Sequence, residues 1–454
     1  MSAPAEATYL NPFSIGAFRP VDRECTASDL AIEGALPPEL DGLLVRNSFS
    51  PFPGRPLPPH LFFADGMLSG LRLRNGKAEW FRNRWVVTAP IAEAKGLPPP
   101  AGAADISWAP VNPANTHIVH HAGRLLALCE VGLPYEVTTD LETRGRFDFD
   151  GALKTNMTAH PRLDPETGDL HFFSYGPRPP FVHYHRADPT GRLVQTDVID
   201  VRGPTVMHDF IITETFAVFF DTPLVFAPPT GAPGGLPFTW NPQYGARIGL
   251  HPLTGGQPTR WFDIEPCFVA HFLNAFEEDG AVVIRGVARD TAYALGTMAP
   301  NHGAIFLQEW RIDLVSGRVS TAVVSDRRVD FPRVDERRLG RPHRFGYSAE
   351  APGSDDWASR GGLFKYDLGT GAILAHEFGP RAKASEPVFV PARPGAAEDE
   401  GWLLSVVYDD ASDASFVAVL DAQAFEGPPV ARIPLPQRVP YGAHGSWIDG
   451  AALG

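Results

Sequence analysis

The sequence predicts an all-β fold, and among all-β folds it favours a β-propeller. Short runs rich in valine, isoleucine and aromatic residues recur along the chain and have the length and composition of strands. Proline and glycine, at 46 and 44 residues, are spread between these runs as turn punctuation. Long stretches with helical periodicity are hard to find.

The predicted strands follow one another from the first tenth of the chain to its end. Each is a short apolar or aromatic run bounded by turn-forming residues. Examples in chain order are Gly42–Arg46, Trp80–Val87, Leu125–Leu128, His171–Tyr175, Ile211–Phe220, Ala281–Val287, Leu403–Val407 and Phe416–Leu420.

A recurring turn pattern joins several of these runs. An acidic residue is followed a few positions later by glycine, with an apolar run on either side. It occurs at Asp164–Gly168, Asp188–Gly191, Asp313–Gly317 and Asp367–Gly371. Aspartate and glycine at these offsets suit tight turns, so each is predicted to close a β-hairpin. Many hairpins at irregular spacing favour a propeller over a sandwich.

Two segments rich in proline, alanine and glycine interrupt the pattern, Ala89–Ala104 and Val225–Pro237. The simpler interpretation is surface loops. The functional interpretation is a cover over one face of the propeller, because loops on a rigid scaffold often build the site.

The bulk composition excludes some partners. A net charge of −14 argues against nucleic acid, which needs a basic surface, and against polybasic attachment to anionic lipid. No apolar stretch is long enough to span a membrane, and the N-terminus does not resemble a signal peptide. Cys25, Cys129 and Cys267 are scattered, as in a reducing compartment. We therefore expect a single domain, residues 1–454, in the cytoplasm.

Four of the fifteen histidines stand alone in apolar or small-residue surroundings, His160, His208, His271 and His444. Structural zinc sites tend to pair ligands a few residues apart, and these histidines are widely separated. A propeller, however, could supply one ligand from each of several blades. A site made only of imidazoles suits iron, copper or zinc.

Two local clusters are the competing metal candidates. By spacing alone, His117, His120 and His121 would be the better choice, but they lie in a strand-like run and a structural or surface role is simpler. His183 and His185 form a second pair with strand spacing. The residues alone leave both alternatives open.

Several motifs in the same order resemble the carotenoid cleavage oxygenase family over nearly the whole chain. They are Leu43–Asn47, Phe62–Met67, Asn83–Val86, Leu125–Glu130, Thr158–Gly168, Met207–Phe210, Asn274–Glu277 and Tyr441–Gly445. The resemblance implies a seven-bladed β-propeller with iron on its axis. It also implies a dome of loops and helices over one face, which encloses a hydrophobic tunnel.

The resemblance also assigns residues to the site. His160, His208, His271 and His444 match the family's metal ligands, and Fe²⁺ is the implied cofactor. Thr116 matches a position whose methyl group blocks one open coordination position. Asp330 stands where the family usually has glutamate, so its shorter side chain predicts a shifted backbone or a bridging water. The carboxylates implied to accept N–H bonds from three of the imidazoles are Glu130, Asp330 and Glu386.

The implied activity is oxidative cleavage of a C=C bond by O2, which yields two carbonyl products. Phenol-cleaving relatives typically carry lysine immediately before the first of these carboxylates. This chain has Cys129 there, which favours a small hydrophobic substrate of the carotenoid or apocarotenoid class. Leu236–Trp240 is a candidate lip for peripheral membrane contact, with a strand edge or dome core as the alternative.

Three alternatives remain at this point. The first is cleavage of a phenolic stilbene or phenylpropene. The second is retinoid isomerisation, in which the same iron site acts on an ester. The third is a non-catalytic propeller that binds a partner on its face.

Overall fold

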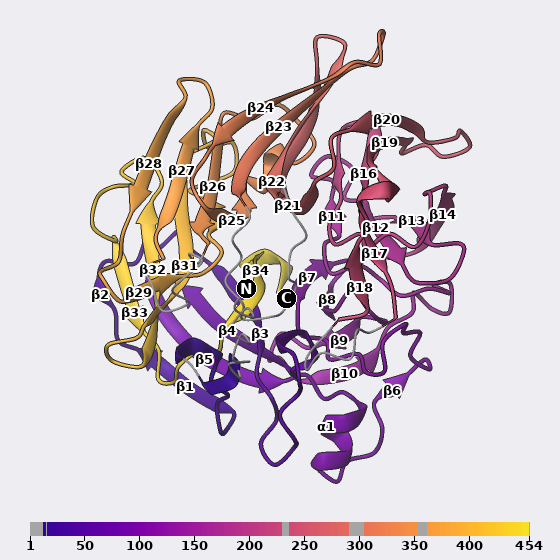
Figure 1. The fold of residues 1–454 in the computed structure, drawn as a ribbon. Coiled ribbons are helices and arrows are strands. Elements are labelled where there is room, and N and C mark those ends of the chain that lie inside the picture. Colours follow the sequence, from indigo (N-terminus) through magenta and orange to yellow (C-terminus); the bar gives the residue numbers. More distant parts are fainter. Residues whose placement is uncertain (1–11, 15, 229–235, 290–303, 352–360, 454) are drawn as a thin grey trace, which may run out of the picture.

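A computed structural model describes residues 12–14, 16–228, 236–289, 304–351 and 361–453. These residues form eight sheets, and the seven with four or more strands are arranged in a ring, which makes the chain a seven-bladed β-propeller (Figure 1). The sequence-based expectation of a propeller is therefore confirmed.

The first four blades follow the chain. Blade 1 contains β1 (Cys25–Leu30), β5 (Lys77–Trp85), β4 (Gly66–Arg74), β3 (Gly42–Phe49) and β34 (Gly442–Asp449). Blade 2 contains β6 (Ala101–Gly102), β10 (Thr143–Arg146), β9 (Tyr135–Val137), β8 (Arg124–Leu128) and β7 (His117–His121). Blade 3 contains β11 (Arg162–Leu163), β12 (Leu170–Tyr175), β13 (Val182–Ala187) and β14 (Leu193–Ile199). Blade 4 contains β15 (Ile211–Ile212), β16 (Phe216–Asp221), β19 (Ala246–Pro252) and β20 (Arg260–Ile264).

The remaining three blades complete the ring. Blade 5 contains β21 (Phe268–Glu278), β22 (Ala281–Arg289), β23 (Ile305–Asp313) and β24 (Val319–Ser325). Blade 6 contains β25 (Val329–Arg333), β26 (Phe345–Glu350), β27 (Leu363–Asp367) and β28 (Ala372–His376). Blade 7 contains β2 (Glu33–Gly34), β33 (Ala431–Pro434), β32 (Ala414–Asp421), β31 (Gly401–Asp409), β29 (Ala382–Ala384) and β30 (Val388–Pro391).

The ring of blades is closed by two strand pairings between the N-terminal and C-terminal parts of the chain. The last strand, β34, pairs antiparallel with β3 near the N-terminus, and Leu43 lies opposite Ile448. The short strand β2 pairs in turn with β33 near the C-terminus. Because each end completes a blade of the other, backbone hydrogen bonds hold the ring shut.

Strands within a blade are more buried than its outermost strand. Every residue of β3 and β12 is buried, whereas β14 alternates between half-buried and exposed residues until its last position. The strands β34, β7, β15, β21, β25 and β30 contact one another between blades, and lie toward the centre of the ring (Figure 1). Side chains at the starts of these inner strands can therefore meet on the axis.

All four predicted hairpin turns are confirmed. They join β11 to β12, β13 to β14, β23 to β24 and β27 to β28. Their glycines take positive φ angles, as in Gly168 at +71° and Gly317 at +73°, which residues with a Cβ rarely adopt.

One predicted strand is wrong in its extent. Ile211–Phe220 is not continuous, because a turn at residues 213–215 separates β15 from β16. The Thr213 hydroxyl accepts hydrogen bonds from the backbone N–H groups of Thr215 and Phe216, and this local bonding replaces the sheet ladder.

The two segments rich in proline and glycine also differ from plain loops. The first contains α1 (Ala89–Ala94) and β6. The second begins in β17 (Leu224–Phe226) and leads to β18 (Phe238–Trp240), which pair as a small hairpin; residues 229–235 lie outside the described residues. Short 3₁₀ helices lie at Pro12–Ser14, Gly16–Phe18, Leu61–Phe63, Pro242–Tyr244, Glu336–Arg338 and Gly450–Ala452.

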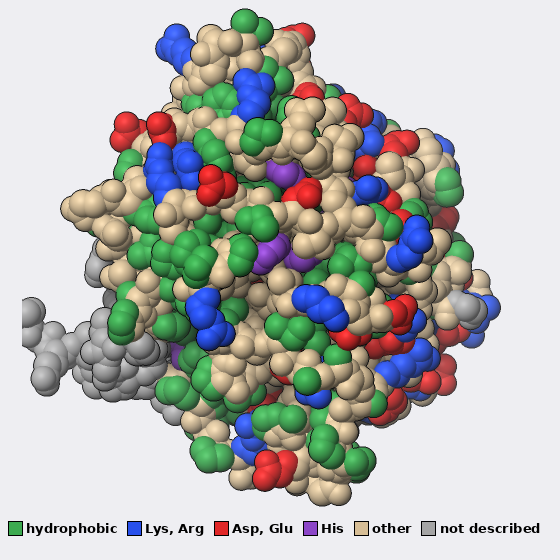
Figure 2. Space-filling view, turned by 90° about the vertical axis from the view of Figure 1, so that its right-hand side faces the viewer, with side chains coloured by type: hydrophobic (Ala, Val, Ile, Leu, Met, Phe, Trp, Pro, Cys, Tyr) green, Lys and Arg blue, Asp and Glu red, His purple; other side chains and the backbone are tan. Residues whose placement is uncertain are grey.

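The flank carrying the outer strands of blades 3 and 4 mixes both signs of charge. Figure 2 shows acidic and basic side chains side by side across this flank. Ion pairs there include Arg186–Asp169 at 2.6 Å and Arg202–Asp263 at 2.6 Å. Among the described residues, no helix has both the length and the apolar character needed to cross a membrane.

Candidate metal centre

The four isolated histidines come from four different blades. His160 and His208 lie just before the inner strands β11 and β15. His271 and His444 lie within β21 and β34. Because the inner strands surround the axis, residues more than 280 positions apart in the sequence converge there.

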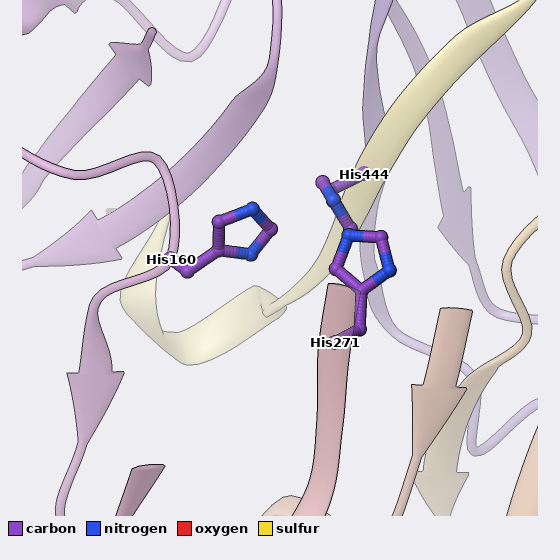
Figure 3. A group of neighbouring side chains, drawn as sticks. All are labelled: His160, His271 and His444. Atoms are coloured by element: carbon purple, nitrogen blue, oxygen red, sulfur yellow. The ribbon is translucent and has the colours of Figure 1, made fainter. Parts of the chain in front are cut away.

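The imidazole rings face one another. Figure 3 shows His160, His271 and His444 directed toward a common point, and one ring nitrogen of each lies within 4.8 Å of the others. His208 joins this group through its Nε2 atom, which lies 3.2 Å from Nε2 of His160 and 3.2 Å from Nε2 of His271. His160, His271 and His444 are buried, and the His208 side chain is 22% exposed.

Three of the rings are held from behind by carboxylates. His208 Nδ1 donates to Glu130 Oε2 at 2.9 Å. His271 Nδ1 donates to Asp330 Oδ1 at 2.6 Å, and His444 Nδ1 donates to Glu386 Oε1 at 2.9 Å. A carboxylate at Nδ1 keeps the proton there and leaves the Nε2 lone pair directed at the centre.

This donor set fits a transition-metal cation. The Nε2 atoms of His208 and His271 lie 3.2 Å apart, and a carboxylate accepts from the Nδ1 atom of each ring. One proton on His208 Nε2 could bridge to only one of its two neighbours, whereas a metal ion accepts all the lone pairs together. Ligation by imidazoles alone suits iron, copper, zinc or nickel.

Burial keeps two of the rings neutral, as metal ligands must be. It lowers the pKa of His160 well below the usual value, and neighbouring His208 adds to the effect. Burial also lowers the pKa of His444 to about 3, although Glu386 opposes it. A neutral ring at neutral pH needs no deprotonation before it binds a metal.

Two of the carboxylates are each paired with an arginine, of which Arg289 is buried and Arg333 is half-buried. Arg289 donates to Asp330 Oδ2 at 2.9 Å, and Arg333 lies 3.2 Å from Glu386 Oε1. Burial would raise the pKa of Glu386, but Arg333 and His444 outweigh it and hold the pKa well below its usual range. The pKa of Asp330 is likewise lowered, against burial, by His271 and Arg289. Both groups therefore stay ionised.

A bulge in β25 explains how the shorter Asp330 reaches its histidine. The pairing of β25 with β26 shifts register between Asp330 and Arg333. Phe331, inside the bulge, takes a φ of +53°, which is a strained value for an aromatic residue. Its N–H donates to Asp330 Oδ1 at 2.9 Å, and its ring packs against His271 with centroids 5.2 Å apart. The shifted backbone lets the carboxylate bond the imidazole directly.

Three histidines of the two local clusters are bonded to other groups of the chain. His117 lies beside it, but its Nδ1 is bonded to the Ala159 carbonyl at 2.8 Å. His121 Nε2 lies 3.2 Å from the Gly168 carbonyl, and His185 is surrounded by threonine and serine hydroxyls. Thr116 lies directly before β7, and its carbonyl accepts the N–H of His444 at 3.1 Å.

The sequence-based reasoning missed the two paired arginines and one aspartate. Arginine is usually exposed, so no composition signal marks Arg289 or Arg333 as a partner of these carboxylates. Asp209 did carry a signal, because it follows His208 inside an otherwise apolar run.

An aromatic cluster lies near Glu130. Trp108 packs against Tyr175, Phe226 and Phe238 with ring centroids 5.0–6.1 Å apart. Burial, together with the charge of Glu130, raises the pKa of Tyr175 well above its usual value. The cluster therefore packs beside the carboxylate that holds His208.

Comparisons with known proteins agree with one another. Residues 18–449 match the protein family described as retinal pigment epithelial membrane protein. A carotenoid cleavage oxygenase from Mycobacterium tuberculosis is 36% identical, covering 98% of this chain and 99% of the relative. The carotenoid 9,10(9',10')-cleavage dioxygenase 1 of Phaseolus vulgaris is 33% identical, covering 95% of this chain and 88% of the relative.

Two solved structures share the whole architecture. The lignostilbene dioxygenase of Pseudomonas brassicacearum has a TM-score of 0.86 and is 31% identical, covering 98% of this chain and 100% of that one. A cobalt-substituted apocarotenoid oxygenase from Synechocystis has a TM-score of 0.84 and is 29% identical, covering 95% and 98%.

Proposed function

Because the chain belongs to the carotenoid cleavage oxygenase family, we propose that it is an Fe(II)-dependent dioxygenase that cleaves a C=C bond of a carotenoid or apocarotenoid. O2 would be the second substrate, and the products would be two carbonyl compounds. The observation that carries the proposal is the convergence of four imidazoles, three of them backed by carboxylates. A non-catalytic binding module would not need this arrangement.

The proposed ligands are His160, His208, His271 and His444. Iron bound there would supply the position at which O2 is activated beside the electron-rich alkene. Glu130, Asp330 and Glu386 would fix three rings in the tautomer that leaves Nε2 free. Thr116, tied to the backbone of His444, would place its methyl group beside an open coordination position. The existence of a cobalt-substituted relative supports a divalent transition metal in such a centre.

The proposed substrate class rests on the residue at position 129, immediately before Glu130. Cys129 is buried there, and burial raises the pKa of its thiol to about 12. A neutral thiol cannot bind a phenolate by charge. The aromatic cluster of Trp108, Tyr175, Phe226 and Phe238 instead favours an apolar polyene.

Phenolic alkenes are the second candidate class. The structural similarity to a lignostilbene dioxygenase, at a TM-score of 0.86, is the observation in their favour. A phenolic substrate would need a donor other than residue 129 to hold its oxygen.

Substrate access from a membrane surface is part of the proposal, for a protein that otherwise works in the cytoplasm. Leu236–Trp240 would be the apolar lip. Phe238 packs against Phe226, with centroids 5.1 Å apart, and Thr239 is exposed. Leu236 and Trp240, which are half-buried, would therefore be the side chains that contact lipid.

Product mass spectrometry tests the proposal. The Fe(II)-loaded protein is incubated in air with long apocarotenals and, separately, with hydroxystilbenes. We expect two carbonyl fragments from the apocarotenals, and none from the same protein carrying His208→Ala. Cleavage of the hydroxystilbenes alone would assign the second substrate class, and an unchanged substrate in every reaction would contradict the proposed activity.

A further inference from the structure

His160 differs from the other three histidines in how it is held. Among the described residues, no carboxylate contacts its Nδ1 atom, whereas His208, His271 and His444 each have one. A ligand without such a partner needs its position fixed by another device, because small shifts of a ligand change metal binding.

Three hydrogen bonds hold the segment around His160 in place. The His160 N–H donates to the Thr158 hydroxyl at 3.0 Å. The ring of His117 is bonded to the carbonyl of Ala159 at 2.8 Å. Two residues after the ligand, Arg162 Nε donates to the Phe210 carbonyl at 2.9 Å. The third hydrogen bond links the His160 segment to the segment that carries His208.

Asp209 is the centre of this link. Its two carboxylate oxygens accept from the Arg162 guanidinium at 2.6 and 2.7 Å. Oδ1 also accepts the N–H of Phe210 at 2.7 Å, and Oδ2 accepts the N–H of Phe272 at 2.9 Å. The Asp209 side chain is 1% exposed, so no water competes for these four hydrogen bonds.

These contacts join three ligand-bearing segments through one carboxylate. Asp209 itself follows His208, Phe272 follows His271, and Arg162 lies two residues after His160. We propose that Asp209 is a positioning residue of the metal centre. It sets the spacing of His160, His208 and His271 through Arg162 and the Phe272 N–H, and so replaces the carboxylate that His160 lacks.

Stability alone does not account for this ion pair. Removing two charges from water is costly, and apolar residues of similar volume often serve a core equally well. A pair of opposite charges also adds no net charge next to the metal. Four directional hydrogen bonds fix where three segments of the chain lie relative to one another, and packing of apolar side chains does this less strictly.

The inference rests on the proposed four-histidine metal site. Co²⁺ binding probes both that site and the positioning role of Asp209. We would measure Co²⁺ affinity by competition with a chelator, the visible absorption spectrum of the Co²⁺ form, and the melting temperature. The variants are Asp209→Asn, Arg162→Lys and His208→Ala in the full chain. Asp221→Asn is the matched control, since Asp221 is fully buried and paired with Arg247 at 2.8 Å and Tyr244 at 2.6 Å.

Asp209→Asn should weaken Co²⁺ binding by about 10-fold or more, the usual effect of losing a group that orients ligands, and should change the spectrum. Arg162→Lys, which keeps the charge but loses the planar fork, should weaken binding less and change the spectrum in the same direction. Asp221→Asn should lower the melting temperature and leave Co²⁺ affinity and spectrum as in the parent.

The outcomes distinguish a failure of the proposed metal site from a failure of the proposed role of Asp209. If His208→Ala binds Co²⁺ like the parent, the proposed metal site is wrong. If only His208→Ala loses Co²⁺ while Asp209→Asn and Arg162→Lys keep the parental affinity and spectrum, Asp209 is not a positioning residue. Should Asp209→Asn fail to fold, the spectrum of Arg162→Lys alone decides, and a parental spectrum overturns the inference.

Discussion

Nε2 of His208 lies 3.2 Å from Nε2 of His271, and each ring faces a carboxylate with its other nitrogen. Glu130 and Asp330 accept from these Nδ1 atoms, 2.9 and 2.6 Å away, which favours the tautomer with its lone pair on Nε2. Two lone pairs at this distance repel each other unless a cation lies between them. The arrangement of the carboxylates is therefore the reason for proposing that a metal ion binds between these rings.

The first prediction concerns the metal ligands. Single alanine variants of His160, His208, His271 and His444 should each lose most of their bound iron, because each removes one lone pair from the shared centre. Iron content of the purified variants, measured by elemental analysis, checks this.

His121→Ala is the control for the first prediction. His121 is buried like three of the four proposed ligands, but its Nε2 atom faces the Gly168 carbonyl at 3.2 Å. This variant should retain parental iron. Full iron occupancy and activity in the His208 variant would show that the proposed ligand set is wrong.

The second prediction concerns Asp330. Asp330→Ala would leave His271 Nδ1 and the buried Arg289 without their shared carboxylate. We expect a loss of about 10–100-fold in metal affinity or activity. Asp330→Glu restores the residue usual in the family and should be tolerated. If both variants match the parent in iron affinity and kcat/KM, Asp330 does not orient His271.

The third prediction is a pH effect on stability from a histidine remote from the metal. Burial lowers the pKa of His185 to about 3, whereas a histidine in the unfolded chain has a pKa of about 6.5. Below that pH the unfolded chain takes up a proton that the folded chain does not, so the free energy of unfolding falls as the pH drops from about 6.5 toward 3. His185→Gln should remove up to about 1.4 kcal/mol per pH unit of this slope.

Denaturant unfolding of parent and variant at several pH values between 7 and 5 measures the third prediction. Comparing the two proteins cancels proton uptake by the metal ligands, which both retain. His183→Gln is the control, because His183 is on the same strand but half-buried and should change the slope less. Parallel stability curves for the parent and His185→Gln would contradict the prediction.

Local signals in the sequence predicted much of the fold. Turns such as Asp164–Gly168 and Asp313–Gly317 can be identified from the sequence, because a tight turn needs glycine at a fixed offset from the aspartate. The extent of Ile211–Phe220 was wrong because the hydroxyl of Thr213 interrupts an apolar run that composition alone treats as continuous. The propeller follows from the turns, and its seven blades from the family resemblance.

The residues of the candidate metal centre were harder to predict from local sequence patterns than the turns were. His160 and His444 are far apart in the sequence, and only the closed ring brings them together. Spacing alone favoured His117 and His121, whose partners turn out to be the carbonyls of Ala159 and Gly168. The Asp330–Arg289 pair depends on the bulge at Phe331, and a φ of +53° at phenylalanine has no sequence signal.

The last prediction concerns the substrate class. The Cys129 thiol is 5% exposed, and its pKa of about 12 keeps it neutral at any physiological pH. No charge at this position can hold a phenolate, so the enzyme should cleave long apocarotenals and do little to resveratrol- or isoeugenol-like phenols. The ratio of kcat/KM values for the two classes measures this discrimination. Cys129→Ser, which stays uncharged, should keep the preference for apocarotenals, and Cys129→Lys should move the ratio toward the phenols. A parental preference for phenols would mean that another group binds the hydroxyl, and the interpretation of position 129 would be wrong.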